Sequence, residues 1–156
     1  MIRLAASADA DAVLALSAPE LAGIAATTLR DLFGQQYIVM AVQTDDATGV
    51  VTAVARTQRR RDATGWISGV DFVWILPALS PRTVVEMAQF CVLEAISRGW
   101  LAWGDPWEAS MDLAVAGVYA DFLRTNFAGS QTSSGTWTYL TGTLQKADFG
   151  RVLRRI

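Results

Sequence analysis

The side chains that most often carry out protein chemistry are scarce in this sequence. Its 156 residues include no histidine and a single cysteine, Cys91. The absence of histidine removes Ser–His and Cys–His nucleophile pairs, histidine general bases and most catalytic zinc sites, and one cysteine cannot build a four-cysteine metal site. Any chemistry must therefore use carboxylates, tyrosine, serine or threonine hydroxyls, backbone dipoles or a bound cofactor.

Arginine is the most concentrated charged residue type. Arg56, Arg59, Arg60 and Arg61 fall within the segment RTQRRRDATG, which we expect to form a hairpin loop between two strands. Such a loop is either a solvated charged surface or a contact for phosphate or an acidic partner. A net charge of −2 for the whole chain gives no general reason to expect nucleic-acid binding.

The elements that must position any site begin with a predicted strand, helix and second strand in the middle of the chain. Val70–Leu76 is apolar apart from Asp71, as in a strand covered on both faces. Ser80 and Pro81 supply a helix start, and Gly99 supplies a stop. Between them apolar residues recur at helical spacing: Val84, Val85, Ala88, Cys91, Val92, Ala95 and Ile96. A strand at Trp100–Trp103 completes a β-α-β unit, which predicts two parallel strands.

The remaining elements follow from hydrophobic periodicity and turn residues. We expect strands at Met1–Ala5, Tyr37–Val42, Val50–Ala55, Gly65–Leu79 and 136–144, helices at Ala10–Ser17, Pro19–Gly34 and from Ser110 or Asp112 to Arg124, a polar turn at Gly129–Gly135, and a short terminal helix in ADFGRVLRRI. The order βαα-βββ-αβ-αβ predicts an α/β fold with a mixed central sheet flanked by helices.

Size and composition predict one domain over residues 1–156, with a core that needs no disulfide or metal. Hydrophobic residues make up 52% and charged residues 18% of the chain, which indicates either a generous core or an apolar face for a partner. The sequence shows no signal peptide and no apolar run long enough to span a membrane. We therefore expect a soluble protein that is not secreted.

Three segments carry a resemblance to a known family: MIRLAASADADAVLAL, the three predicted strands from Tyr37 to Leu79, and FLRTNFAGSQTSSGTWTYL. They resemble, in turn, the first strand and helix, the second to fourth strands, and the closing helix, turn and next strand of the GNAT family of N-acetyltransferases. The resemblance implies a GNAT-like fold that binds acetyl-CoA in a V-shaped gap between the fourth and fifth strands. It places the cofactor pyrophosphate at the start of the following helix, where backbone N–H groups and the helix dipole favour an anion.

The family motif at that helix start is Arg/Gln-x-x-Gly-x-Gly/Ala, and this sequence departs from it. Over 82–87, Arg82 is kept, but Val85 and Met87 replace the small residues, and Glu86 adds a negative charge. The resemblance therefore predicts that the phosphate cradle is degenerate. If acetyl-CoA does bind, the resemblance assigns it to Leu76, Leu79, Arg82, Thr83, Val84 and Val85.

The family's acid and base are also incompletely matched. Anchoring its Phe-Tyr-x-x-x-Gly-Phe pattern on Phe127 puts Phe122 at the tyrosine that protonates the departing thiolate. Tyr119, one helical turn earlier, either replaces that tyrosine or packs in the core. The family base is a carboxylate near the central strands, and Asp71 is the candidate here, unless it is only hydrogen-bonded to backbone at a strand irregularity.

From these departures we predict a non-catalytic GNAT-like protein without a cofactor. It would act as a structural or interaction component of a larger assembly, such as a tailed-phage virion, and contact other subunits or copies of itself. Its location would then be virion-associated or cytoplasmic. The alternative is an acetyl-CoA-dependent N-acetyltransferase with a divergent cofactor loop, in which Asp71 is the base and Tyr119 the acid. Nucleic-acid contact through the arginine loop is the least favoured reading, and a membrane partner is not expected.

Overall fold

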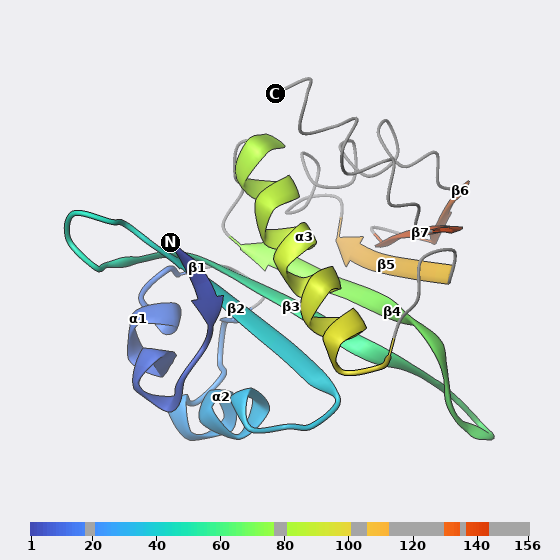
Figure 1. Cartoon of the computed structure of the whole chain (residues 1–156), viewed down its shortest axis with the longest axis horizontal. Helices are drawn as coiled ribbons and strands as arrows, with labels where there is room; N and C mark the ends of the chain where they lie inside the picture. The colour runs from blue at the N-terminus through green and yellow to red at the C-terminus, as the bar shows by residue number, and fades with distance from the viewer. Residues whose placement is uncertain (18–20, 77–80, 101–105, 113–129, 135–136, 144–156) are drawn as a thin grey trace.

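The protein is built on one mixed β-sheet (Figure 1). The computed structural model describes residues 1–17, 21–76, 81–100, 106–112, 130–134 and 137–143. The strands are β1 (Ile2–Leu4), β2 (Ile38–Thr44), β3 (Val51–Asp62), β4 (Gly65–Leu76), β5 (Pro106–Asp112), β6 (Ser130–Ser134) and β7 (Trp137–Thr143). They lie in the order β1-β2-β3-β4-β5-β7-β6, and every neighbouring pair is antiparallel except β4 and β5. The predicted α/β class with a mixed central sheet is confirmed.

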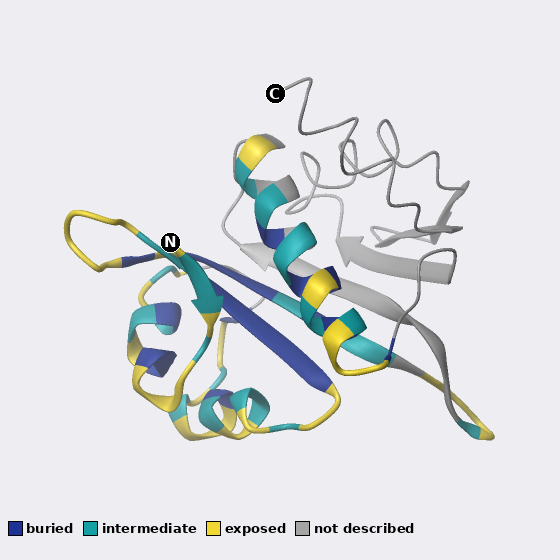
Figure 2. Ribbon diagram, in the orientation of Figure 1, coloured by how far each residue is buried: buried dark blue, intermediate teal, exposed yellow. Residues whose placement is uncertain are grey.

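Helices cover the two faces of this sheet. The described ones are a short 3-10 helix η1 (Ser7–Asp9) and the α-helices α1 (Ala10–Leu14), α2 (Ala26–Phe33) and α3 (Pro81–Ser97). Side chains of α1 and α2 form one core cluster with alternate residues of β2, namely Ile38, Met40 and Val42, and with Val54 of β3. The intervening Val39 and Ala41 are buried as well, because α3 packs against β2 and β3 from the other side. Figure 2 shows β2 buried along most of its length between these layers.

Helix α3 forms where the sequence predicts it. Its buried residues recur at helical spacing against the sheet: Met87, Cys91, Val92 and Ala95. The Thr57 side chain of β3 hydrogen-bonds Cys91, and burial raises the pKa of this thiol to about 12. The helix ends before Gly99, whose φ of 76° lies in the left-handed region that glycine adopts without strain.

A partly buried ion pair joins β1 to the start of α1. Asp9 accepts hydrogen bonds from Arg3 Nη1 at 2.7 Å and Nη2 at 2.9 Å, and from the backbone N–H of Ala6 at 2.7 Å. These bonds, chiefly the one from Arg3, hold the pKa of the Asp9 carboxyl below its ordinary value although burial opposes the shift. The contact fixes how the first strand enters the first helix.

The first two predicted helices are shorter than the sequence indicates. Helix α1 ends at Leu14 rather than Ser17, which has a φ of 54°. Helix α2 begins at Ala26 rather than Pro19, because Gly23 has a φ of 76° and interrupts any helix that starts earlier. The periodic apolar residues before Ala26 still pack inward, since Leu21 belongs to the same core cluster.

The prediction that the segment RTQRRRDATG forms a hairpin loop is wrong. Strand β3 continues through Arg56, Arg59, Arg60 and Arg61 to Asp62, and it pairs with β4 as far as this last residue. The resulting β3–β4 hairpin is long and its tip projects from the body of the protein (Figure 1). Cross-strand pairing with the apolar run of β4 stabilises an extended conformation that the charged residues alone do not predict.

Two predictions near the end of the chain are also corrected. The described strand after α3 is β5, at Pro106–Asp112, and Ser110 and Asp112 belong to this strand rather than capping a helix. The strand predicted at Trp100–Trp103 lies, beyond Trp100, outside the described residues. The predicted polar turn at 129–135 contains strand β6, paired with β7. The last predicted strand is confirmed as β7, whereas the predicted helices over 113–124 and at the terminus lie outside the described residues.

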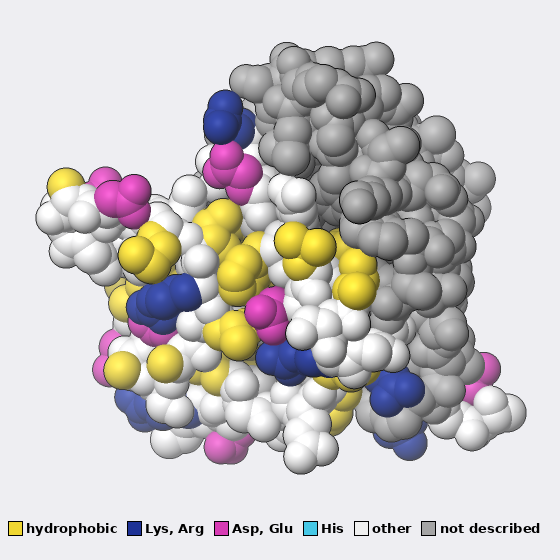
Figure 3. All heavy atoms as spheres, in the orientation of Figure 1, with side chains coloured by type: hydrophobic (Ala, Val, Ile, Leu, Met, Phe, Trp, Pro, Cys, Tyr) yellow, Lys and Arg dark blue, Asp and Glu magenta, His cyan; other side chains and the backbone are white. Residues whose placement is uncertain are grey.

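Hydrophobic side chains appear among charged ones on the face that carries α3 (Figure 3). Leu93 of α3 is 50% exposed, and Leu4 of β1 is also exposed. Among the described helices, none combines the length and apolar character needed to cross a membrane.

Candidate functional site

The two parallel strands at the centre of the sheet pair over only part of their length. β4 and β5 are in register at Val70 with Trp107, Asp71 with Glu108, and Phe72 with Ala109. Beyond that point residues 74–76 of β4 pair only with β3, and residues 110–112 of β5 pair only with β7. Pairing between the two strands therefore stops before their carboxyl ends, and we call this unpaired region of the sheet the gap.

A β-bulge lies where the pairing between β4 and β5 ends. On β3 the neighbours Arg56 and Thr57 pair with Trp74 and Phe72 of β4, so Val73 is an extra residue without a partner on β3. A bulge of this kind bends its strand and increases the local twist. It lies directly after the last pair between β4 and β5, which is where the gap begins.

Strand separation leaves backbone polar groups free of the sheet. In residues 73–76, the N–H and C=O groups that face away from β3 have no ladder partner on β5, and the same holds for residues 110–112 on the side away from β7. Backbone groups of this kind are strong donors and acceptors. An extended ligand that carries amide groups can pair with them as an added strand would.

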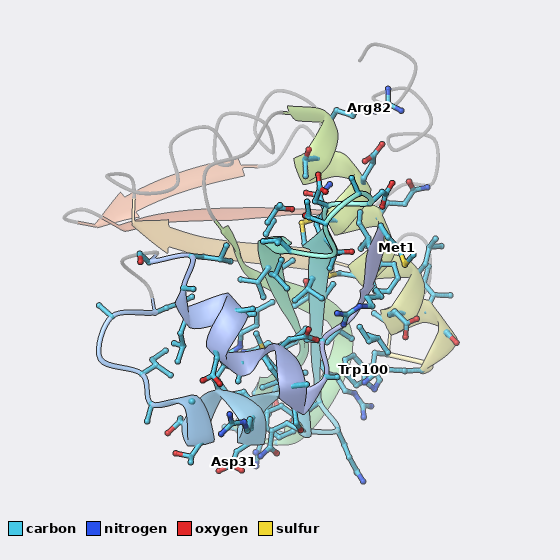
Figure 4. All side chains as sticks on the ribbon, turned by 90° about the vertical axis from the view of Figure 1, so that its left-hand side faces the viewer. Met1, Asp31, Arg82 and Trp100 are labelled. Carbon is cyan, nitrogen blue, oxygen red and sulfur yellow. The ribbon has the colours of Figure 1, made fainter. Side chains whose placement is uncertain are left out.

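Helix α3 begins just beyond the end of β4, with Pro81 in its first turn. The first N–H groups of a helix have no partner within it, and the helix dipole favours an anion there. Arg82, in the first turn, is 65% exposed, and its Nε donates to Glu86 Oε1 at 3.0 Å. Figure 4 shows Arg82 and Trp100 at opposite ends of this helix.

A positive side chain in the first turn opposes the helix dipole unless an anion lies nearby. The second ion pair on α3, from Glu94 to Arg98 at 3.7 Å, has the favourable order, with the acid first and the base near the carboxyl end. The pair of Arg82 and Glu86 has the opposite order. An anion bound at the amino end of α3 would compensate for the unfavourable placement of Arg82.

A row of polar residues crosses the sheet at the closed end of the gap. Register aligns Gln58 of β3 with Asp71 of β4, Asp71 with Glu108 of β5, and Glu108 with Thr141 of β7. Residues in one row share a face of the sheet. Two carboxylates, at positions 71 and 108, therefore occupy neighbouring places where the two strands part.

Sequence reasoning selected Asp71 and missed Glu108. The strand was predicted at 100–103, so residues 106–112 were not considered as a strand. In that segment apolar and polar residues alternate: Trp107, Ala109 and Met111 with Glu108, Ser110 and Asp112. This strict alternation is typical of a strand, so it is the sequence signal that could have identified β5.

The other predicted site residues are placed only in part. Leu76 is the last residue of β4, and Arg82, Thr83, Val84 and Val85 lie in the first turns of α3. Leu79 and Tyr119 lie outside the described residues. Met87, which replaces a small residue of the family motif, is fully buried, so its bulk lies in the core beneath α3. No group of three or more potential metal ligands occurs within the described part of the chain.

The fold is shared with solved acetyltransferase structures. An N-acetyltransferase from Staphylococcus aureus Mu50 matches with a TM-score of 0.68 and 14% identity, over 93% of this chain and 98% of that chain. An aminoglycoside 6'-acetyltransferase type Ii matches with a TM-score of 0.67 and 12% identity, over 92% and 96%. A structure described as a putative phosphinothricin N-acetyltransferase matches with a TM-score of 0.65 and 15% identity, over 94% and 99%. No family model and no curated protein matches the sequence.

These matches establish that the chain has the GNAT-like fold that its sequence predicts. They contradict the predicted role as a non-catalytic virion component, since the neighbours named above are acetyltransferases and none is a phage structural protein. That prediction relied on the missing small residues of the cofactor motif. The strand gap and the amino end of α3 are backbone features, which those substitutions leave in place.

Proposed function

We propose that this chain, which has the fold of the GNAT acetyltransferases, transfers an acetyl group from acetyl-CoA to an amine. The observation that supports this function best is the separation of β4 and β5 beside the amino end of α3. An extended thioester cofactor with a phosphate-bearing end requires both features: a slot between strands for its chain and a positive helix end for its phosphates.

The residues at the gap fit such a cofactor. The amide groups of its chain would pair with the free backbone groups of residues 73–76 and 110–112. The N–H groups of the first turn of α3 would bind its pyrophosphate, with Arg82 at the exposed side. Backbone donors need no glycine to bind an anion, although the sequence has Val85 where the family motif has glycine.

When bound, acetyl-CoA supplies an acetyl group already activated as a thioester. An amine acceptor arrives at neutral pH as an ammonium ion, so it must lose a proton before its nitrogen can attack a carbonyl carbon. Asp71 or Glu108 would take this proton, because they flank the place where the strands part. Tyr119 stays the predicted acid that returns a proton to the sulfur of CoA.

Turnover measurements on matched carboxylate variants test this proposal. The full chain would be supplied with acetyl-CoA and a panel of amines, and CoA release followed with a thiol reagent. The buried Cys91 adds little background to such an assay. We expect Asp71→Asn or Glu108→Gln to lower kcat/KM by roughly 100-fold or more, the usual range for loss of a general base.

Asp31→Asn is the control, because Asp31 is an exposed carboxylate on α2, remote from α3 in Figure 4. It should leave kcat/KM unchanged. If both site variants retain full activity, the assigned base is wrong. If the folded wild-type protein acetylates no amine in the panel and binds no acetyl-CoA, the proposed function itself is wrong.

A further inference from the structure

Arg56 of β3 has an unusual environment for a charged residue. Its side chain is half-buried, and its Nε is buried without a hydrogen-bond partner. Nη2 donates to Gln58 Oε1 at 3.2 Å. Burial lowers the pKa of the guanidinium, although Tyr37 opposes the shift. A buried donor without a partner is costly, and the cost is larger for a charged group.

Four other arginines of the described chain have acidic partners. Arg3, Arg30, Arg82 and Arg98 each lie within 3.7 Å of an aspartate or glutamate oxygen. Within the part of the chain that the structure describes, no carboxylate lies at ion-pair distance from Arg56. A desolvated guanidinium that bonds only a neutral amide retains most of its capacity to bind an anion.

The register of the strands places Arg56 next to the proposed site. It pairs with Met40 of β2, which belongs to the α1–α2 core cluster, so Arg56 is on the face of the sheet opposite α3. On its other side it pairs with Trp74 of β4, the residue that follows the bulge at the gap. Its partner Gln58 lies in the same row as Asp71 and Glu108.

A gap between two strands opens to both faces of a sheet. The amino end of α3 would hold the phosphates of the cofactor on one face, so the acceptor amine would approach the reacting end from the other. That second face is the one that carries Arg56 and the row of carboxylates. An acceptor placed there would meet a fixed positive charge next to the candidate bases.

We propose that Arg56, with Gln58, binds a carboxylate of the acceptor, which is therefore a small amine that also bears a carboxylate, as in an amino acid. This inference rests on the proposed acetyl transfer. Guanidinium is suited to the role because its planar donors match the two oxygens of a carboxylate. The acceptor carboxylate would supply the negative partner that Arg56 lacks among the described residues, and it would orient the amine toward Asp71 or Glu108.

The test compares acceptors that differ only in the carboxylate. Each amino acid of a panel would be assayed beside its amide and its decarboxylated amine, at saturating acetyl-CoA. We expect kcat/KM for the free acid to exceed that for the amide by roughly 10- to 100-fold, the range for a hydrogen bond to a charged group. Arg56→Met, which keeps an unbranched apolar stem and removes the charge, should abolish this preference by lowering kcat/KM for the free acid more than for its amide.

Arg56→Lys and a matched control separate this role from a structural one. Arg56→Lys keeps the charge without the planar donors and should retain part of the preference. Arg30→Met removes a partly exposed arginine of α2 and should leave the preference intact. A purely structural Arg56 would lower stability and turnover of acid and amide together, which would overturn the inference.

Binding of acetyl-CoA distinguishes failure of this inference from failure of the function. If wild type binds acetyl-CoA and acetylates amides or simple amines as well as acids, the carboxylate specificity is wrong and the acetyl transfer stands. If the folded protein neither binds acetyl-CoA nor acetylates any member of the panel, both proposals are overturned.

Discussion

The ion pair between Arg82 and Glu86 offers a sharp test of whether the amino end of α3 binds phosphate. Glu86 is 35% exposed, and its Oε1 accepts from Arg82 Nε at 3.0 Å. Substitution of Glu86 by Gln removes a negative charge close to the proposed phosphate position and releases Arg82 to contact the ligand. We expect the variant to bind acetyl-CoA more tightly than wild type.

The size of the effect follows from simple electrostatics. A unit charge about 8 Å from another contributes roughly 0.5 kcal/mol at the dielectric constant of water. Release of Arg82 from an exposed pair of this spacing adds about 0.3–0.5 kcal/mol. The sum is about 1 kcal/mol, which corresponds to a decrease in Kd of roughly fivefold. The gain should shrink at high salt, because screening weakens both contributions.

The same helix contains a matched control. Glu94→Gln makes the same chemical change in a second pair of the same spacing, with Arg98 at 3.7 Å. Position 94 lies eight residues beyond 86, about 12 Å farther along the helix, which exceeds the screening length of roughly 8 Å at physiological salt. Calorimetric titration of both variants and wild type with acetyl-CoA gives the comparison. Equal changes in Kd for the two variants, or no change for Glu86→Gln, would refute a phosphate site at the amino end of α3.

Three further predictions concern the framework around the site. Cys91 should resist alkylation in the folded protein at pH 8 and react only on unfolding, since burial raises the pKa of its thiol to about 12; mass spectrometry of the alkylated protein measures this, and rapid labelling of the native state would contradict it. Because Arg3 lowers the pKa of Asp9 in the folded state, the pair stabilises the protein above the unfolded pKa of about 3.9 and this contribution is lost as pH falls through the lower folded value. The melting temperatures of wild type and Asp9→Asn, measured from pH 7 to pH 2, should therefore converge at low pH. A difference in melting temperature that stays constant with pH would show that the charge of Asp9 does not contribute to stability. Met87→Ala should lower the free energy of unfolding by about 2–5 kcal/mol in urea titrations, because the residue is fully buried between α3 and the sheet, and a loss below about 1 kcal/mol would mean that the site collapses around the smaller side chain.

The sequence predicts the order of elements well, because that order depends on periodicity and on strong start and stop residues. Helix α3 is found from its apolar spacing and from Pro81 and Gly99, and the hairpin strands are found from their β-branched runs. Strand β3 is underestimated, since Arg56 to Asp62 are extended through pairing with β4, a non-local interaction that local composition does not encode.

The candidate site shows the same division between local and non-local information. Asp71 stands out in the sequence because it interrupts an apolar run, but its neighbour Glu108 is known only from the register of two parallel strands 37 residues apart. The gap begins beside a bulge at Val73, and nothing in the residues around it marks one extra position in the strand. The register that creates this arrangement depends on non-local pairing, which a side-chain motif does not reveal.

Calorimetric titration of the full chain with acetyl-CoA tests the central claim most directly. The account predicts saturable binding at one site per chain, with acetyl-CoA and CoA binding comparably because both carry the chain and phosphates that the gap and α3 would contact. The absence of binding heat at high ligand concentration, from a sample shown to be folded, would contradict it.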